Sequence, residues 1–316
     1  MLLTREIGFS LHSEPFRNRT LNHPRFTKFH GYGNDYLVFE AKQLRTIDDL
    51  TAFARRICNR HYGAGSDGIA IVQESEPRRV GVAGGHAGQS DFSVRIFNPD
   101  GSEASMSGNG TRCAAAYLFF HGLWFEKQLR LQTRNGIKSY SLLERSEPGT
   151  FLFASELGRP KFDSASIPMS TSTPLDRVID FPLKVDNQTI RVTALQMGNP
   201  NCCIFVNDFS GLDWRRLGPL IENHPAFPER TNVIFVRVHD RNNIEERLWE
   251  RGVGETESSG TCSCAAVVAS VINEKTDRQV QVHAPGGVIP IEWRDDDEVV
   301  LTGRAEVVYS GKWLLE

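Results

Sequence analysis

Two Ser-Gly segments, about 150 residues apart, each open an alanine-rich stretch and constrain the fold more than any other feature of this chain. The first runs Ser107-Gly-Asn-Gly-Thr-Arg-Cys-Ala-Ala115, and the second runs Ser259-Gly-Thr-Cys-Ser-Cys-Ala-Ala266. Both follow strand-like runs and a polar turn that contains glycine. An internal echo of this kind predicts two related halves, each built of strands around one helix. If the halves face each other, the two turns lie on either side of one cleft. Chance similarity of two helix starts is the alternative.

Short apolar runs separated by Gly, Asn and Asp predict a chain rich in strands from residue 26 onward. Strands are expected at residues 36–39, 69–72, 92–97, 129–133, 189–194, 202–206, 232–238, 246–249, 299–302 and 305–309. Helices are expected at residues 46–59, 110–121 and about 262–272. A proline-containing segment, 144–182, separates the halves, and we expect the domain crossing near its start.

Composition excludes several classes of protein. A formal net charge of −3 gives no reason to expect a broad phosphate-binding surface, so nucleic acid is not expected as a partner. No apolar run approaches the roughly 18–20 residues that cross a bilayer, so no membrane partner is expected either. The six cysteines show no repeated metal-ligand spacing, which predicts no metal site, and their small number favours a reducing cytoplasm. Residues 1–25 lack the apolar run of a secretory signal and are expected to form an N-terminal extension.

Ser107 and Ser259 each stand before a glycine at a predicted helix start, and serine is a favoured N-cap residue. Capping alone is therefore a sufficient structural interpretation of either residue. The same geometry also presents free backbone N–H groups and the positive end of a helix to an anion such as a substrate carboxylate. Two helix N-termini directed at one cleft can share one carboxylate between them.

Six motifs occur in a fixed order between residues 26 and 261. They are Phe26-Thr-Lys-Phe-His-Gly-Tyr-Gly-Asn-Asp-Tyr36; Asn98-Pro-Asp-Gly-Ser-Glu103 running into Met106-Ser-Gly-Asn-Gly-Thr-Arg-Cys113; Gly198-Asn-Pro200; Thr231-Asn-Val233; Trp249-Glu-Arg-Gly-Val-Gly-Glu-Thr256; and Ser259-Gly-Thr261. Any one short match is weak evidence, but the order and the long Glu-Arg-Gly-x-Gly-Glu-Thr string are specific. By these motifs the chain resembles the diaminopimelate epimerase family, and the resemblance extends over about residues 26–311.

The resemblance implies an α/β fold of two pseudo-twofold-related domains, each a β-barrel-like sheet around a central helix. We expect a first domain over residues 26–148, joined by a C-terminal strand at 303–316, and a second domain over 149–302. The implied activity is the interconversion of L,L- and meso-diaminopimelate in lysine biosynthesis, without a cofactor. A diaminopimelate-like amino acid is the implied small-molecule partner, and a homodimer the implied assembly.

Residue by residue, Ser107 and Ser259 match the family's two catalytic cysteines. The other implied site residues are Gly108, Asn109, Gly260 and Thr261 around the reacting carboxylate, Asn34 and Glu250 near the reacting centre, and Asn98, Asn199, Asn232 and Arg251 at the far amino-acid end of the substrate. An arginine suits this last position because its guanidinium binds a carboxylate through two hydrogen bonds.

The two serines are a departure from the family, since a hydroxyl is a much weaker acid than a thiol, whose ordinary pKa is about 8.5. A serine is also a poor base unless another group takes its proton. Asn201 where the family usually has His, Gly68 after Asp67 and Cys262 in place of Gly depart too. A natural divergent branch explains all of these changes, whereas an engineered Cys-to-Ser trap explains only the serines.

Three functions remain open from the sequence. The first is diaminopimelate epimerisation with altered chemistry. The second is isomerisation or lysis of another small amino acid, with Glu250 or a serine as the base. The third is amino-acid binding without catalysis. The far-end residues favour the first function, and the missing thiols favour the other two.

Overall fold

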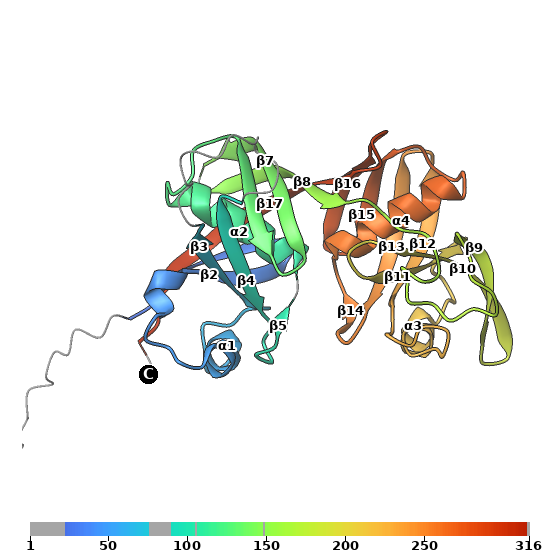
Figure 1. The fold of residues 1–316 in the computed structure, drawn as a ribbon, viewed down its shortest axis with the longest axis horizontal. Coiled ribbons are helices and arrows are strands. Elements are labelled where there is room, and N and C mark those ends of the chain that lie inside the picture. The colour runs from blue at the N-terminus through green and yellow to red at the C-terminus, as the bar shows by residue number, and fades with distance from the viewer. Residues whose placement is uncertain (1–22, 76–89, 105, 148, 315–316) are drawn as a thin grey trace, which may run out of the picture.

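Strands enclose one helix in each half of the molecule (Figure 1). The computed structural model describes residues 23–75, 90–104, 106–147 and 149–314. In the first half, eight strands form a closed ring of hydrogen-bonded neighbours around helix α2 (Gly108–Phe120). In ring order they are β1 (Arg25–Gly31), β2 (Asn34–Glu40), β3 (Ile69–Glu74), β4 (Phe92–Phe97), β6 (Gln128–Thr133), β7 (Gly136–Ser146), β8 (Thr150–Gly158) and β17 (Val299–Lys312).

The second half repeats this arrangement around helix α4 (Gly260–Ile272). Its own strands are β10 (Gln188–Gln196), β11 (Pro200–Val206), β12 (Asn232–Asp240), β13 (Asn243–Glu250), β15 (Gln279–Ala284) and β16 (Gly287–Trp293). Strand β16 pairs with β17, which pairs with β8, and a bridge between Lys161 and Gln196 closes the ring onto β10. Strand β9 (Val178–Val185) adds to the outer side of β10.

The pairing pattern is the same in both rings. Strands β2 and β3 are parallel and are joined through α1 (Leu50–Cys58), as β11 and β12 are joined through α3 (Trp214–Glu222). Strands β4 and β6 are parallel across α2, as β13 and β15 are across α4. A short strand precedes each central helix, β5 (Glu103–Ala104) and β14 (Gly254–Thr256). The predicted fold class, an α/β protein with a barrel-like sheet around a helix in each of two related halves, is confirmed.

The central helices are apolar on every side, which explains why strands surround them. From Cys113 to Phe119 every residue of α2 is buried, and so is every residue of α4 from Cys262 to Ser270. A helix that is apolar all round gains little from one packing face and must be covered completely. The small side chains of Ala114–Ala116 and Ala265–Ala266 let the strands approach closely.

Strands β8 and β17 belong to both halves and run between them (Figure 1). The prediction of two separate strands at residues 299–302 and 305–309 is wrong, because β17 continues through Gly303 as one strand. The domain boundaries at 148/149 and 302/303 stay predictions. The predicted extension at 1–25 lies mostly outside the described residues, and β1 already begins at Arg25.

One helix begins later than predicted, and another is not predicted at all. Helix α1 begins at Leu50 rather than residue 46, because the Asp49 carboxylate caps it by accepting a hydrogen bond from Ala52 N at 2.9 Å. The sequence pattern does not reveal α3, since Gly218 and Pro219 lie inside it and both residue types disfavour a helix interior. A 3₁₀ turn, η1 (Ala41–Leu44), follows β2. Within the described ranges, no helix is both long and apolar enough to span a membrane.

The core of the first ring yields a stability prediction. Phe153 of β8 is fully buried and packs against the rings of Phe119, Tyr140 and Phe151. Phe153→Ala should lower the free energy of unfolding by about 3–5 kcal/mol in urea denaturation, because it leaves a cavity that the ring cannot close. Phe125→Ala is the control, since that ring is 84% exposed, and should change it by less than about 0.5 kcal/mol. Equal effects of the two substitutions would contradict this packing.

Candidate active site

The N-termini of the two central helices meet between the rings. Ser107 and Ser259 are the N-cap residues of α2 and α4, and both have extended backbone angles. A β-carbon added to Gly108 would lie only 3.9 Å from the Cα of Gly260. The first N–H groups of a helix have no acceptor within it, so two sets of donors face one volume. The two Ser-Gly turns therefore face each other, as expected if the halves face each other, and the expected cleft between them stays a prediction.

The Ser107 hydroxyl makes two contacts. It accepts a hydrogen bond from Gly110 N at 3.1 Å, as an N-cap does, and lies 2.8 Å from the phenol oxygen of Tyr36 on β2. Burial raises the pKa of Tyr36 well above its usual range, so the phenol is protonated in the resting protein. A protonated Tyr36 can donate to Ser107, which leaves the serine's own proton free for a bound molecule.

Ser259 has a different partner. Its hydroxyl donates to Glu250 Oε2 at 2.8 Å and makes no capping hydrogen bond to the helix. Burial raises the pKa of Glu250, whereas the hydrogen bond from Ser259 lowers it, and burial has the larger effect. A carboxylate with a raised pKa is a better proton acceptor. The two serines therefore stand in chemically opposite settings, one beside a protonated phenol and one beside a carboxyl base.

Asn34 and Asn109 form a chain of side-chain hydrogen bonds beside Ser107. Asn109 Nδ2 donates to Asn34 Oδ1 at 3.2 Å, and Asn34 Nδ2 donates to Asp67 Oδ2 at 2.9 Å. Asn109 in turn accepts from the guanidinium of Arg112. These contacts orient both amides, and they connect the first turn of α2 to β2 and to the loop before β3.

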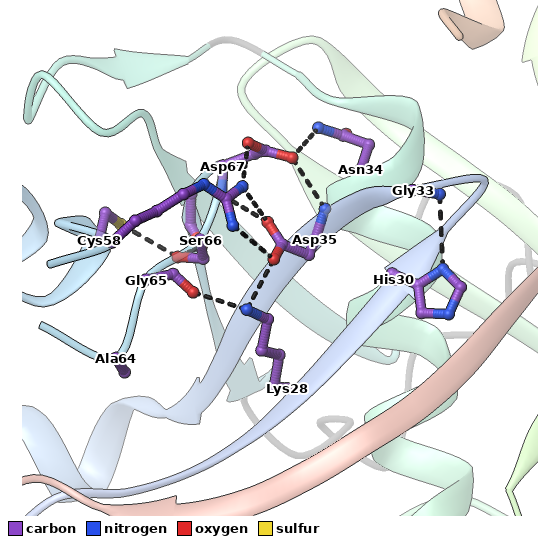
Figure 2. Close-up of polar contacts among 12 residues, drawn as sticks. Lys28, His30, Gly33, Asn34, Asp35, Cys58, Ala64, Gly65, Ser66 and Asp67 are labelled. Carbon is purple, nitrogen blue, oxygen red and sulfur yellow. Dashed lines mark hydrogen bonds and ion pairs between the residues drawn. The ribbon is translucent and has the colours of Figure 1, made fainter. Parts of the chain in front are cut away.

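An ion cluster anchors this chain from the far side, as Figure 2 shows. The Asp35 carboxylate lies 2.6 Å from Lys28 Nζ and 2.9 Å from Arg60, and Arg60 also lies 2.7 Å from Asp67. Burial alone would raise the pKa of Asp35, but hydrogen bonds from Arg60 and Lys28 outweigh it and lower that pKa. The cluster therefore fixes the position of the Asp67 carboxylate that accepts the hydrogen bond from Asn34.

Arg112 brings a buried positive charge to the same helix start. It is 2% exposed, donates to the Arg304 carbonyl at 3.0 Å and lies 5.7 Å from the Tyr32 ring. Two glycines make room for it, because a β-carbon at Gly31 or Gly303 would lie 2.9 Å from its guanidinium. This charge adds to the positive end of α2.

Three of the four predicted far-end residues lie in one hydrogen-bond network on the second half. Asn199 Nδ2 lies 3.4 Å from Thr261 Oγ1, and Asn199 accepts from Asn201, which accepts from Asn232 at 3.1 Å. Asn232 Oδ1 then accepts from Arg251 N at 2.9 Å. Asn201, a departure from the family pattern, thus links Asn199 to Asn232. The Arg251 guanidinium donates to the Glu229 carbonyl at 3.0 Å.

Asn98 is not joined to this network by any contact within the described part of the chain. It lies in the turn after β4 and donates to Ser102 Oγ at 3.0 Å. Its predicted role at the far end of the substrate therefore stays a prediction. The described residues also hold no cluster of three or more His, Cys, Asp or Glu side chains arranged for a metal ion.

Known proteins match this chain along most of its length. The family model described as diaminopimelate epimerase matches residues 26–162 and 193–308. A diaminopimelate epimerase from Pelotomaculum thermopropionicum is 42% identical over 289 residues, which cover 91% of this chain and 98% of the relative. One from Desulforudis audaxviator is 41% identical over 290 residues, with 92% and 99% covered. The chain belongs to the diaminopimelate epimerase family.

Solved structures with much lower identity share the fold. A phenazine biosynthesis protein of the PhzF family from Bacillus anthracis has a TM-score of 0.62 at 16% identity, with 92% of this chain and 99% of that chain covered. A probable proline racemase from Agrobacterium radiobacter K84 has a TM-score of 0.63 at 15% identity, with 93% of each chain covered. These two structures support the arrangement of the halves, and membership of the diaminopimelate epimerase family rests on the closer relatives.

Sequence reasoning missed three residues that this member of the family places at the site: Tyr36, Asp67 and Arg112. The sequence could have revealed Tyr36 as a site residue, because it follows Asn34 by two residues on a strand and so points to the same side of the sheet. No such signal marks Asp67 or Arg112, since Asp67 accepts from Asn34 on β2 and Arg112 donates to the Arg304 carbonyl, and both partners are distant in the sequence.

The ion cluster gives a pH-dependent prediction. The folded-state pKa of Asp35 lies below its ordinary value, so its ionisation stabilises the fold at neutral pH and this stabilisation is lost as pH falls through the lowered pKa. Asp35→Asn should therefore cost about 3 kcal/mol at pH 7 and much less near pH 2, measured by denaturant unfolding. Exposed Asp48→Asn is the control and should show no such trend. A pH-independent loss in Asp35→Asn would exclude the ionised role.

Proposed function

We propose that this protein epimerises an α-carbon of diaminopimelate without a cofactor, with Ser259 and Ser107 on opposite faces of that carbon. The observation that carries the proposal is that two helix N-termini meet, and that the serine at the N-cap position of each is hydrogen-bonded to an ionisable side chain. Membership of the diaminopimelate epimerase family supports the substrate, and the network of Asn199, Asn232 and Arg251 supports the grip on its far end.

In this proposal the reacting carboxylate lies between the starts of α2 and α4. The N–H groups of Gly108, Asn109, Gly260 and Thr261 donate to it, and the positive helix ends stabilise the charge that builds up when the α-proton leaves. Arg112, in the first turns of α2, adds a positive charge near the same helix start. Asn34, held by Asp67 and Asn109, lines the reacting centre.

The proton transfers follow from the two different serine settings. On one face, Ser259 gives its hydroxyl proton to Glu250 and takes the α-proton, so Glu250 ends protonated and Ser259 is again a hydroxyl. On the other face, Ser107 gives its proton to the α-carbon and receives one from Tyr36. Serine is ordinarily a weak base, and Glu250 makes Ser259 a stronger one because it takes the hydroxyl proton. Proton exchange with solvent resets Glu250 and Tyr36.

The cellular setting and assembly are parts of the proposal. All six cysteines are buried and unpaired, which fits a reducing compartment such as the cytoplasm. The homodimer that the family resemblance implies is proposed for this chain as well, and light scattering of the purified protein tests it.

Deuterium exchange tests the activity directly. Incubation with L,L-diaminopimelate in D₂O should place deuterium on the α-carbons at a rate above buffer. Ser259→Ala and Glu250→Gln should each lower that rate by about 10²–10⁴-fold, as expected for loss of an acid–base group. Glu245→Gln is the matched control, because Glu245 lies on the same strand but pairs with Arg237 and Arg247 instead. Measurable binding without exchange would reject epimerisation and leave an amino-acid-binding protein.

A second substitution series tests whether the scaffold still supports thiol chemistry. Ser107→Cys combined with Ser259→Cys should raise the exchange rate at least about tenfold, because a thiol with an ordinary pKa near 8.5 is far more readily ionised than a hydroxyl. Ser210→Cys, on an exposed turn, is the control and should change nothing. A double variant as slow as the parent would show that the thiols are not what limits this site.

A further inference from the structure

Glu246 is a fully buried carboxyl group inside the second ring, and it takes no part in the proposed proton transfers. It has 0% exposure and lies on β13 four residues before Glu250, on the same face of the strand. Its Oε1 lies 2.5 Å from Ser263 Oγ, and its Oε2 has no hydrogen-bond partner among the described residues. A carboxylate in this place would be a bare buried charge, which is very costly.

The hydrogen bonds around Ser263 identify the protonation state. Ser263 Oγ lies 2.8 Å from the carbonyl oxygen of Ser259 as well as 2.5 Å from Glu246. A carbonyl only accepts and a serine has one proton, so Ser263 donates to Ser259. The hydrogen between Ser263 and Glu246 must then come from Glu246. Both contacts are satisfied together only when Glu246 is a neutral carboxylic acid.

The surroundings of Glu246 agree with a neutral acid. From its own strand, Glu250 lies near it, while Arg247 binds the backbone carbonyl of Glu246 and the carboxylate of Glu245. The opposing residue on β12 is Val236. The thiols of β11 and α4 that lie near it are all buried, and burial raises the pKa of each: Cys203, Cys262 and Cys264. Burial, with a smaller contribution from Glu250, outweighs the lowering effects of the Ser263 contact and of Arg247 and raises the pKa of Glu246 to about 8.

We propose that Glu246 is a positioning residue for proton transfer at Ser259, acting as a neutral acid that holds the first turn of α4 through Ser263. Glu250 contacts the Ser259 hydroxyl, and Ser263, held by Glu246, donates to the Ser259 carbonyl. Neutrality has a second effect. An ionised Glu246 would keep Glu250 protonated by repulsion, and a protonated Glu250 cannot take the Ser259 proton.

Glu246→Gln is the central test, because the amide keeps a donor to Ser263 but cannot ionise. The test rests on the proposed function, and it measures the ratio of the exchange rate of the wild type to that of Glu246→Gln. The ratio should fall about tenfold between pH 7 and pH 9 as Glu246 ionises in the wild type. The loss should appear in kcat, with KM little changed, since Glu246 does not touch the substrate. A ratio that does not change with pH would overturn the proposal.

Two measurements test whether Glu246 is neutral and do not depend on catalytic activity. The infrared band of a protonated carboxylic acid should be present in the wild type at pH 7 and weaker in Glu246→Gln. The wild type should also lose thermal stability relative to the variant as pH rises from about 5 to 8, because an acid whose pKa is raised on folding binds a proton that the unfolded chain releases. Their absence would refute a neutral Glu246, whereas their presence with no exchange in any protein would refute only the proposed function.

A matched serine pair separates positioning from simple helix stability. Ser263 and Ser270 are both buried in α4 and both donate to the carbonyl four residues earlier, but only Ser263 contacts a carboxyl group. Ser263→Ala should lower the exchange rate at least about tenfold, as expected for a misplaced reacting group, whereas Ser270→Ala should leave it nearly unchanged. Equal rates in the two variants would count against the proposed role of Glu246.

Discussion

The complete enclosure of two apolar helices is the constraint on which the rest of the structure depends. Because α2 and α4 are buried on every side, strands must close around each of them, and only the helix ends remain for polar contacts. The shared strands β8 and β17 hold the two rings together so that the two N-termini meet. Donors and partial positive charge from both helices then face one place, which favours a carboxylate there.

The symmetry of the scaffold does not extend to the side chains at the helix starts. The Ser107 hydroxyl is hydrogen-bonded to the phenol of Tyr36 on β2, whereas the Ser259 hydroxyl is hydrogen-bonded to the carboxyl group of Glu250 on β13. The two faces of a molecule held between the helices therefore meet different groups. This difference suits a reaction in which one face loses a proton and the other gains one. The buried acid Glu246 extends the difference, because it supports only the Ser259 side.

The features that sequence analysis predicted correctly depend on a few neighbouring residues. A serine, a glycine and a run of small apolar residues identify a capped helix start without any knowledge of the fold, and α2 and α4 begin within two residues of their predicted starts. Predictions failed where a glycine that usually marks the end of a helix or strand is required instead by a contact with a distant residue. Gly303 looks like the end of a strand, yet β17 continues through it, and its missing side chain makes room for Arg112. Gly218 disfavours a helix, but Trp249 packs against it closely enough to exclude a side chain.

The sequence by itself determined the two halves, the two serine caps and the family to which the chain belongs. Only the tertiary structure decided which group each serine hydroxyl contacts, which asparagines form a network and that Glu246 is fully buried beside Ser263. The physical reason is the range of the forces involved. Helix starts depend on backbone preferences over a few residues, whereas desolvation and hydrogen-bond partners depend on everything that packs around a group.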